Sequence, residues 1–325
     1  MENNNAHDVK HVVDLILADY KKGRDIDKMD TVHQPNQDVI IDIVEKLLRI
    51  FFPGYYRDRY YMGFNESNRL SVLIEDVLFN LQSQIATVLR STPEFATASN
   101  CTLMKEAWRI TYTFAEAIPK IREYLDTDLE ATFEGDPAAC DKDEIVLSYP
   151  GLYTTALNRI AHELFVLGVP LIPRMITEHA HSKTGIDIHP GATIGHYFCI
   201  DHGTGIVIGS TTTIGDHVKV YQGVTLGALS TRAGQLLHGK KRHPTIEDYV
   251  TVYSGASILG GETVIGANSV IGSNAFITKS VPADSRVSIQ NHELHMKRGS
   301  KSGEATFEEP EDSSNGNDDS WVYVI

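Results

Sequence analysis

The sequence predicts an α+β protein in which an all-α amino-terminal half is followed by a solenoid of short β-strands. Apolar residues keep a helical spacing over residues 8–181, whereas over 186–280 an aliphatic residue returns at every sixth position. A period of six fits neither a helix, whose period is 3.6, nor a simple strand, whose side chains alternate at two. Short strands joined by tight corners and wound as a coil give this period.

The amino-terminal half is expected to form one helical domain, residues 1–183. Its helices are predicted over Val9–Tyr20, Val39–Leu48, Arg69–Leu89, Thr102–Leu125, Pro137–Leu147, Tyr153–Leu167 and Ile172–His181. The second of them stops at Pro53-Gly54. Asp136 followed by Pro137 is typical of an N-cap with proline at the first helical position.

The coil is expected over residues 184–290, and four groups of aliphatic residues keep its period. They are Ile188, Ile194 and Ile200; Ile208, Ile214, Val220 and Leu226; Ile246, Val252 and Ile258; and Ile265, Ile271 and Ile277. Each of these side chains should point to the axis and stack on its equivalent one turn later, which contributes about 1.5 to 3 kcal/mol per residue. One turn cannot bury itself, so several must stack.

The period is interrupted in three places. Two extra residues enter within Asp201–Gly205, and a long excursion runs over Ala228–Thr245. A slip of one residue between Ile258 and Ile265 has no functional interpretation from the sequence. A regular solenoid has no need of bulges or loops, so the first two interruptions are the predicted places of function.

Composition excludes several classes of function. The chain has 325 residues and a net charge of -14, which argues against nucleic acid as a partner. It has no apolar run near 18 residues and no basic-then-apolar start, so neither a membrane span nor a secretory signal is expected. Cys101, Cys140 and Cys199 are odd in number and widely spaced, as expected for reduced thiols in the cytoplasm.

The tail, residues 291–325, is polar and acidic and is expected to be disordered. It ends, however, in the apolar cluster Trp321–Ile325. A frayed end is one interpretation. A docking peptide that presents aromatic residues and a terminal carboxylate to a partner is the interpretation we favour.

The bulge places a histidine within one turn of a carboxylate. A turn spans about eighteen residues, so His202 can meet Asp187, and such a pair suits a general base for an alcohol. A solvated loop histidine is the alternative. On the excursion, Arg242 followed by His243 suits the grip of a carboxylate. A surface charge run with the two preceding lysines is the alternative there.

The histidines and cysteines also raise two other kinds of chemistry, a zinc site and a cysteine nucleophile. A zinc site like that of the hexapeptide-repeat carbonic anhydrases would draw on His189, His196, His202 and His217. No metal is expected, since zinc needs three protein ligands that the spacing does not fix. Cys199 as a nucleophile lies beside the inward Ile200 and lacks a neighbour that lowers its pKa, so we interpret it as a strand residue.

An ordered set of motifs resembles the serine O-acetyltransferases. The set is Asp136-Pro137-Ala138, Arg159-Ile160-Ala161-His162, Asp187-Ile188-His189-Pro190, Asp201-His202-Gly203-Thr204-Gly205, Val224-Thr225-Leu226-Gly227 and Arg242-His243-Pro244. The resemblance is close over residues 136–282 and loose over the amino-terminal helices. It implies a left-handed parallel β-helix, an exception to right-handed crossovers. It also implies homotrimers with active sites between neighbouring subunits, with trimers paired in some members.

The resemblance implies transfer of acetyl from acetyl-CoA to the hydroxyl of L-serine, which gives O-acetyl-L-serine, a precursor of cysteine. By residue, His202 corresponds to the general base for direct attack and Asp187 to the carboxylate that orients it. Asp136 and Asp201 correspond to the residues that hold the substrate's amino group. Their counterparts for its carboxylate are Arg242 and His243.

The resemblance extends to ligands and partners. Acetyl-CoA enters as a co-substrate and no cofactor is permanently bound, with Ala228, Ser254 and Ser273 along its pantetheine arm. Ile325 corresponds to the end of a peptide that enters O-acetylserine sulfhydrylase.

The chain departs from the family pattern in places. Gly203 stands where many relatives carry alanine, a change expected to matter little, and the excursion over 228–241 is longer than usual. Two rival functions stay open. They are a sugar O-acetyltransferase of the same fold and a non-catalytic scaffold that acts through its tail.

Overall fold

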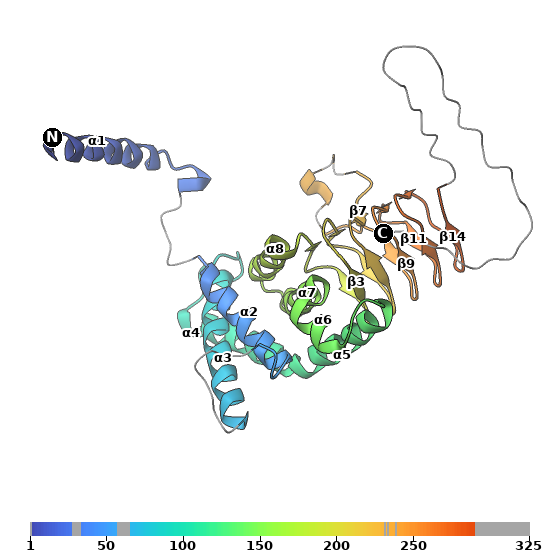
Figure 1. Ribbon diagram of the computed structural model, residues 1–325. Helices are drawn as coiled ribbons and strands as arrows, with labels where there is room; N and C mark the ends of the chain where they lie inside the picture. The colour runs from blue at the N-terminus through green and yellow to red at the C-terminus, as the bar shows by residue number, and fades with distance from the viewer. Residues whose placement is uncertain are drawn as a thin grey trace, which may run out of the picture. The chain divides into compact units, whose positions relative to one another are not determined.

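The computed structural model describes residues 2–27, 34–56, 66–230, 232, 234–237 and 239–289 (Figure 1). Residues 1–289 form one unit and residues 290–325 a second. The tail predicted to be disordered, with Ile325, lies outside the described residues. The predicted boundary between residues 183 and 184 stays a prediction; the last helix of the amino-terminal half ends at Thr184.

The amino-terminal half is helical, as its apolar spacing predicts. The helices are α1 (Glu2–Tyr20), η1 (Asp25–Asp27), α2 (Gln37–Phe51), α3 (Glu66–Arg90), α4 (Asn100–Glu116), α5 (Ile118–Gly135), α6 (Lys142–Ser148), α7 (Pro150–Val166) and α8 (Ile172–Thr184). Side-chain caps explain two of the starts. Asn36 accepts hydrogen bonds from the first backbone amides of α2, and Ser99 accepts one from Thr102 of α4.

Two details of the helical half differ from the prediction. The run expected over 102–125 is two helices, because Pro119 in the first turn of α5 cannot continue a helix from α4, and α5 then continues to Gly135. Asp136 is not the N-cap of the next helix. It ends α5, and Asp141 caps α6 by accepting the amide of Glu144 at 2.8 Å. Pro137 lies in the turn between α5 and α6 and not at the start of a helix.

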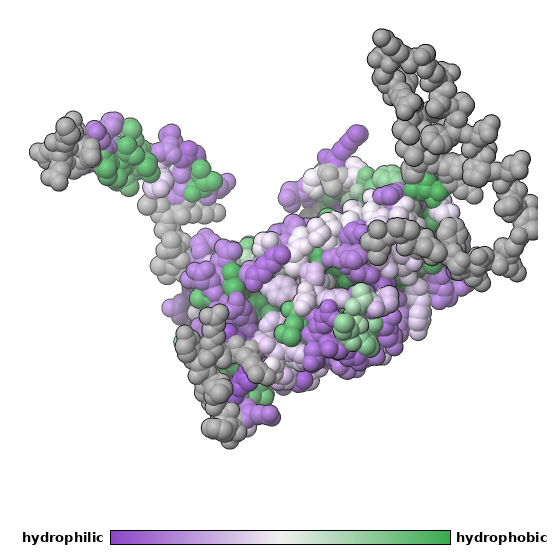
Figure 2. Space-filling model, viewed as in Figure 1, coloured by the Kyte–Doolittle hydropathy of each residue, from purple (hydrophilic) through white to green (hydrophobic). Residues whose placement is uncertain are grey.

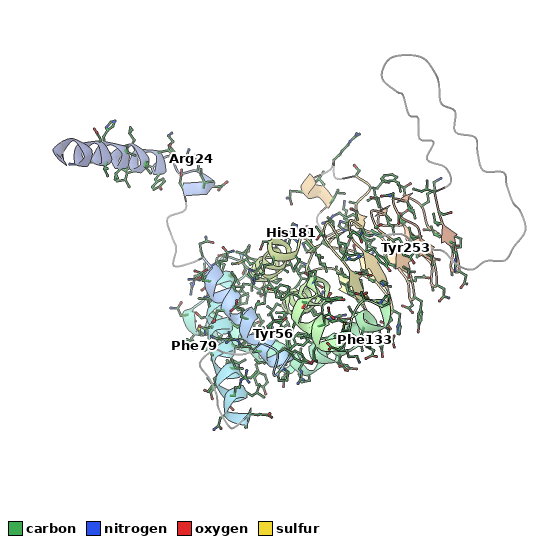
Figure 3. The ribbon with its side chains drawn as sticks, in the orientation of Figure 1. Arg24, Tyr56, Phe79, Phe133, His181 and Tyr253 are labelled. Carbon is green, nitrogen blue, oxygen red and sulfur yellow. The ribbon has the colours of Figure 1, made fainter. Side chains whose placement is uncertain are left out.

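Helix α3 is the one described helix long and apolar enough to cross a membrane. It also buries Leu81 and Ile85 in the helical core, and it contacts both α2 and α4. Its Phe79 points away from that core (Figure 3). Helix α1 exposes apolar side chains, which form green areas in Figure 2. They include Val13 and Ile16.

The second half is a coil of parallel strands with three faces. Face A holds β1 (Asp187–Ile188), β4 (Val207–Ile208), β7 (Thr225–Gly227), β10 (Ser257–Leu259) and β13 (Phe276–Ile277). Face B holds β2 (Thr193–Ile194), β5 (Thr213–Ile214), β8 (Thr245–Ile246) and β11 (Val264–Ile265). Face C holds β3 (Cys199–Asp201), β6 (Lys219–Tyr221), β9 (Thr251–Val252), β12 (Val270–Ile271) and β14 (Arg286–Val287).

The predicted inward column is confirmed. Ile188 pairs with Ile208, Ile208 with Leu226, and Leu226 with Ile258 along face A, and each of these side chains is buried. Because the aliphatic residues of successive turns stack on one another, the coil has a continuous apolar core. The residues between strands therefore lie at three corners: A–B, B–C and C–A.

A buried ion pair holds the coil on the helices. Arg159 of α7 donates to both carboxylate oxygens of Asp128 of α5 at 2.7 and 2.8 Å. The same guanidinium donates to the carbonyls of Ile194 and Gly195, and Asp128 accepts the amide of Phe198 at 3.0 Å. The helices thereby fix the first turn of the coil, and the predicted bulge follows directly after it.

Candidate active site

The bulge lies at the C–A corner, between β3 and β4. His202 has a positive φ of 57°, followed by Gly203 at 92° and Gly205 at 84°, so the chain turns outward in a left-handed conformation. The amide of Gly205 donates to the carbonyl of Gly185 at 2.8 Å, which ties the bulge to the turn above it. The His202 side chain is 51% exposed and therefore accessible to a substrate.

Gly203 matters more than the sequence suggested. Its φ is one that side chains rarely adopt, and a Cβ there would lie 2.5 Å from Cδ1 of the buried Ile186. Alanine would therefore require a different backbone at this position.

Two acidic residues from distant parts of the chain gather beside His202. Asp201, on β3, places Oδ1 at 3.9 Å from Nε2 of His202. Asp136 arrives from the end of α5, where Tyr149 donates its hydroxyl to Oδ2 at 2.6 Å. That hydrogen bond is the main cause of a lowered pKa of Asp136, to which the charge of His202 also contributes. The structure thus brings Asp136, Asp201 and His202 together, as predicted.

Two members of this cluster were not foreseen. Lys219, on β6, donates to the carbonyl of Gly135 at 2.5 Å and pairs with Oδ2 of Asp201 at 3.1 Å. Tyr149, just before α7, holds Asp136, which raises the pKa of the Tyr149 hydroxyl to about 12. The signal in the sequence was weak. Lys219 flanks the inward Val220, and an outward position carries no periodic constraint.

The A–B corner holds the second pair of predicted residues. Arg242 donates from Nη2 to Oγ of Ser210 at 2.7 Å, and its backbone amide donates to Oγ1 of Thr211 at 2.9 Å. His243 is 7% exposed, and its Nδ1 accepts the amide of Thr211 at 3.1 Å. Because Nδ1 is an acceptor, Nε2 carries the proton of the neutral ring. Its ring packs on Gly209, where a Cβ would lie 2.1 Å from Cδ2.

A second histidine at this corner is held in the same way. Nδ1 of His189 accepts the amide of Gly191 at 2.9 Å, so its Nε2 also carries the proton. Burial, with Arg174 next, lowers the pKa of His189 to about 4. Burial, with Arg242 next, lowers the pKa of His243 to about 4 as well. Both rings are therefore neutral hydrogen-bond donors at neutral pH.

The slip of one residue also has a place here. Gly260 and Gly261 form the A–B corner beneath the returning excursion, and a Cβ on Gly261 would lie 2.5 Å from the carbonyl oxygen of Lys241. The extra residue thus lies where the excursion rejoins the coil.

The predicted contact between Asp187 and His202 does not form within one chain. Asp187 pairs instead with Arg174 of α8 at 3.1 Å, and the hydrogen bonds and ion pairs of the described residues include none between Asp187 and His202. Both residues lie in adjacent turns, as the spacing indicated. However, Asp187 points outward from face A, next to the A–B cluster, whereas His202 stands on the C–A corner.

The three residues expected along the coenzyme divide between the corners. Oγ of Ser254 and Oγ of Ser273 lie 3.3 Å apart at the C–A corner, in the turns that follow His202. A column of glycines runs beside them, at Gly205, Gly223 and Gly255. Tyr221 stacks on Tyr253 at the edge of face C nearby, with ring centroids 4.9 Å apart. Ala228, by contrast, follows β7 on the A–B side.

The rival chemistries lose support. Among the described residues, Glu178, His181 and Asp187 could hold a metal ion by proximity, and none of the four histidines weighed as zinc ligands is among them. Arg174 pairs with Glu178 and Asp187 of that group, so its guanidinium already neutralises part of their negative charge. Cys199 is 3% exposed, and burial raises the pKa of its thiol to about 11, so it is unsuited as a nucleophile.

Comparisons with known proteins agree on one family. No family model matches the chain. A plasmid-encoded serine acetyltransferase of Synechococcus elongatus is 43% identical over 265 residues, 78% of this chain and 81% of that protein. The serine acetyltransferase of Bacillus subtilis is 45% identical over 135 residues, 42% of this chain and 59% of its own.

Solved structures give the same result. Serine acetyltransferase 1 of Entamoeba histolytica, in complex with L-cysteine, is 33% identical with a TM-score of 0.66, over 79% of this chain and 87% of that one. The serine acetyltransferase of Neisseria gonorrhoeae, in complex with serine, is 26% identical with a TM-score of 0.50, over 78% and 95%. The likeness therefore spans both the helices and the coil.

Proposed function

The chain belongs to the serine acetyltransferase family, and we propose that His202 is the general base with which it transfers acetyl from acetyl-CoA to L-serine. The product is O-acetyl-L-serine, in the first step of cysteine biosynthesis. The observation that carries the proposal is the accessible His202 beside Asp136 and Asp201 on an outward bulge. Membership of this family argues against the two rival functions, the sugar acetyltransferase and the non-catalytic scaffold. An assay that compares serine with a galactoside as acceptor tests the sugar acetyltransferase.

The proposed step is direct. Nε2 of His202 takes the proton of the serine hydroxyl while that oxygen attacks the thioester carbon. The tetrahedral intermediate collapses, the carbon–sulfur bond breaks, and His202 returns the proton to the departing thiolate of coenzyme A. No acyl-enzyme is required, which agrees with the buried Cys199.

Both charges of serine have a match. The α-ammonium suits the carboxylates of Asp136 and Asp201. The α-carboxylate suits the guanidinium of Arg242 and the Nε2–H of His243, whose tautomer is fixed by Thr211. A galactoside needs neither pair.

These two sets of residues lie at opposite edges of face A, so we propose that the site forms between neighbouring copies of the chain. The C–A corner of one copy then meets the A–B corner of the next in a closed trimer. Face A supports this arrangement because its outward residues include Val207, 40% exposed, and Phe276, 71% exposed. In this arrangement Asp187 would orient His202 of the neighbouring copy while it keeps its ion pair with Arg174. Pairing of trimers through the helical halves is a further part of the proposal.

Acetyl-CoA enters as a substrate, not as a resident cofactor. Ser254 and Ser273 extend the C–A corner away from His202, and the glycines beside them leave the backbone open to a pantetheine arm. Ala228 would contribute from the neighbouring copy. L-cysteine, bound in the Entamoeba histolytica structure, carries the same two charges as serine and would fit the same groups.

The test is replacement of the base. His202→Ala should lower kcat by about 10² to 10⁴, because the hydroxyl loses its proton acceptor, with an unchanged far-ultraviolet circular dichroism spectrum. Thiol release from acetyl-CoA, with L-serine and without an acceptor, measures it. His11→Ala, which removes an exposed histidine of α1, is the matched control. Turnover in His202→Ala equal to that of the control would remove His202 from the mechanism.

For the tail, we propose docking of Ile325 into O-acetylserine sulfhydrylase in the cytoplasm. Deleting Ile325 should abolish that binding and leave acetyl transfer intact, because the coil does not depend on the last residue. Titration calorimetry with the sulfhydrylase measures it. Undiminished heat of binding would contradict the role of Ile325.

A further inference from the structure

Lys219 is held at the C–A corner by groups from three elements. Its Nζ reaches the carbonyl of Gly135 at the end of α5 and Oδ2 of Asp201 on β3. It also lies 4.7 Å from the centre of the Tyr221 ring. The side chain is 18% exposed, so this position is fixed by packing and not by a passing surface contact. The proposed mechanism assigns no role to a lysine here.

Lys219 is a cation in this setting. Burial opposes its charged form, but hydrogen bonding with Tyr221 and the attraction of Asp201 together raise the pKa of Lys219 to about 12. The same charge contributes to the lowered pKa of Asp136, after the hydrogen bond from Tyr149. Lys219 is therefore a fixed cation beside the carboxylates of Asp136 and Asp201.

The other titratable groups that face this corner come from every element packed against it. They are Asp136 at the end of α5, Glu144 of α6, Tyr149 before α7, Cys199 and Asp201 of β3, His202 of the bulge and Tyr221 of β6. Apart from His202, these groups are acidic or neutral. The positive charge beside the two carboxylates is thus supplied by Lys219.

We propose that Lys219 is a built-in counter-ion that leaves Asp136 and Asp201 with one net negative charge, enough for one substrate ammonium, and so keeps His202 free to accept the serine proton. This inference rests on the proposed function. Two unneutralised carboxylates would stabilise an imidazolium at His202, and a protonated base cannot take a proton. Lys219 acts through these groups and is a positioning residue.

The experiment compares Lys219→Met, Lys219→Gln and Lys219→Arg in the full chain by the pH dependence of kcat/KM for L-serine. In the Met and Gln variants the acidic limb should move to higher pH by about one unit, so that activity on that limb falls about tenfold and recovers at high pH. Lys219→Arg should restore the limb because it keeps the charge. The KM for acetyl-CoA should stay unchanged.

The control is Lys120→Met, which removes a surface lysine paired with Glu163 and should leave the profile in place. If both neutral variants fold, by circular dichroism, and either match the wild type or lose activity equally at every pH, the inference is overturned, because a purely structural lysine gives that result. Loss of the proposed function itself is recognised separately, by absent serine-dependent thiol release in the wild type or full activity in His202→Ala.

Discussion

The two edges of face A differ in how they hold a histidine, because one exposes its side chain and the other buries it. At the C–A corner two extra residues push His202 outward, where its side chain is 51% exposed. At the A–B corner a long excursion folds back and buries His243 to 7% exposure. A base that exchanges a proton with a substrate must be reachable, whereas a donor that recognises a carboxylate gains from a fixed ring. The coil thus carries two different halves of a site at two edges of one surface.

Burial also sets the charge at each edge. Acidic groups crowd the C–A corner and are balanced by Lys219. The A–B corner is cationic through Arg242, and its two histidines stay neutral because burial and nearby arginines disfavour a further positive charge. Each edge matches one end of a zwitterion, and neither is sufficient alone.

The largest expected effect tests whether the two edges meet between copies. His202→Ala breaks the C–A corner and Arg242→Ala the A–B corner, so each should lose at least about 10²-fold in kcat/KM. Mixed in equal amounts, unfolded and refolded together, they should regain about a quarter of wild-type activity, because one interface in four pairs two intact edges in a cyclic assembly. Thiol release measures it. No regain would place both edges in one chain.

The next effect concerns the buried histidines. Each has a folded pKa near 4, below the ordinary value of 6.5, so the unfolded chain binds more protons between these values. Stability is therefore complete above about pH 6.5 and falls as the pH drops towards 4, by on the order of 3 kcal/mol for each histidine. Urea unfolding at pH 8, 6.5 and 5 measures it. His243→Asn, whose amide oxygen can still accept from Thr211, should flatten the slope.

The same slope in His243→Asn as in the wild type would assign the acid sensitivity to other groups. Removal of the exposed His202 is the matched comparison, and His202→Ala should keep the wild-type slope.

The smallest effect sharpens how the A–B edge is held. Gly209→Ala would place a methyl group 2.1 Å from the His243 ring, so the buried ring must shift. We expect a loss of about 1 to 3 kcal/mol in stability and a higher KM for serine, with the KM for acetyl-CoA unchanged. Leu236→Ala, which trims a side chain of the excursion that is 76% exposed, is the control for stability. An unaffected Gly209→Ala would mean that the His243 ring is free to move.

The sequence predicted some residues of this site and not others, depending on whether a local pattern fixes the direction of the side chain. The bulge that carries Asp201 and His202 was predicted from the break in the period, which is a local signal, whereas Asp136 was grouped with them only through the resemblance to the family. Within one chain Asp187 pairs with Arg174 and not with His202, because an outward carboxylate takes whichever cation lies nearest, and Arg174 comes from a helix. Lys219 was missed because its partner, Gly135, lies 84 residues away in the chain.

The sequence by itself determined the helical half, the period of six and the stacked inward column, because every turn of a coil must bury the same apolar positions. It also determined where the period breaks. Only the tertiary structure decided which outward side chains share a corner, that the predicted site divides between two edges, and that a lysine balances the acids beside His202. Those contacts depend on helices that pack against the coil from far away in the chain, and no periodic pattern constrains them.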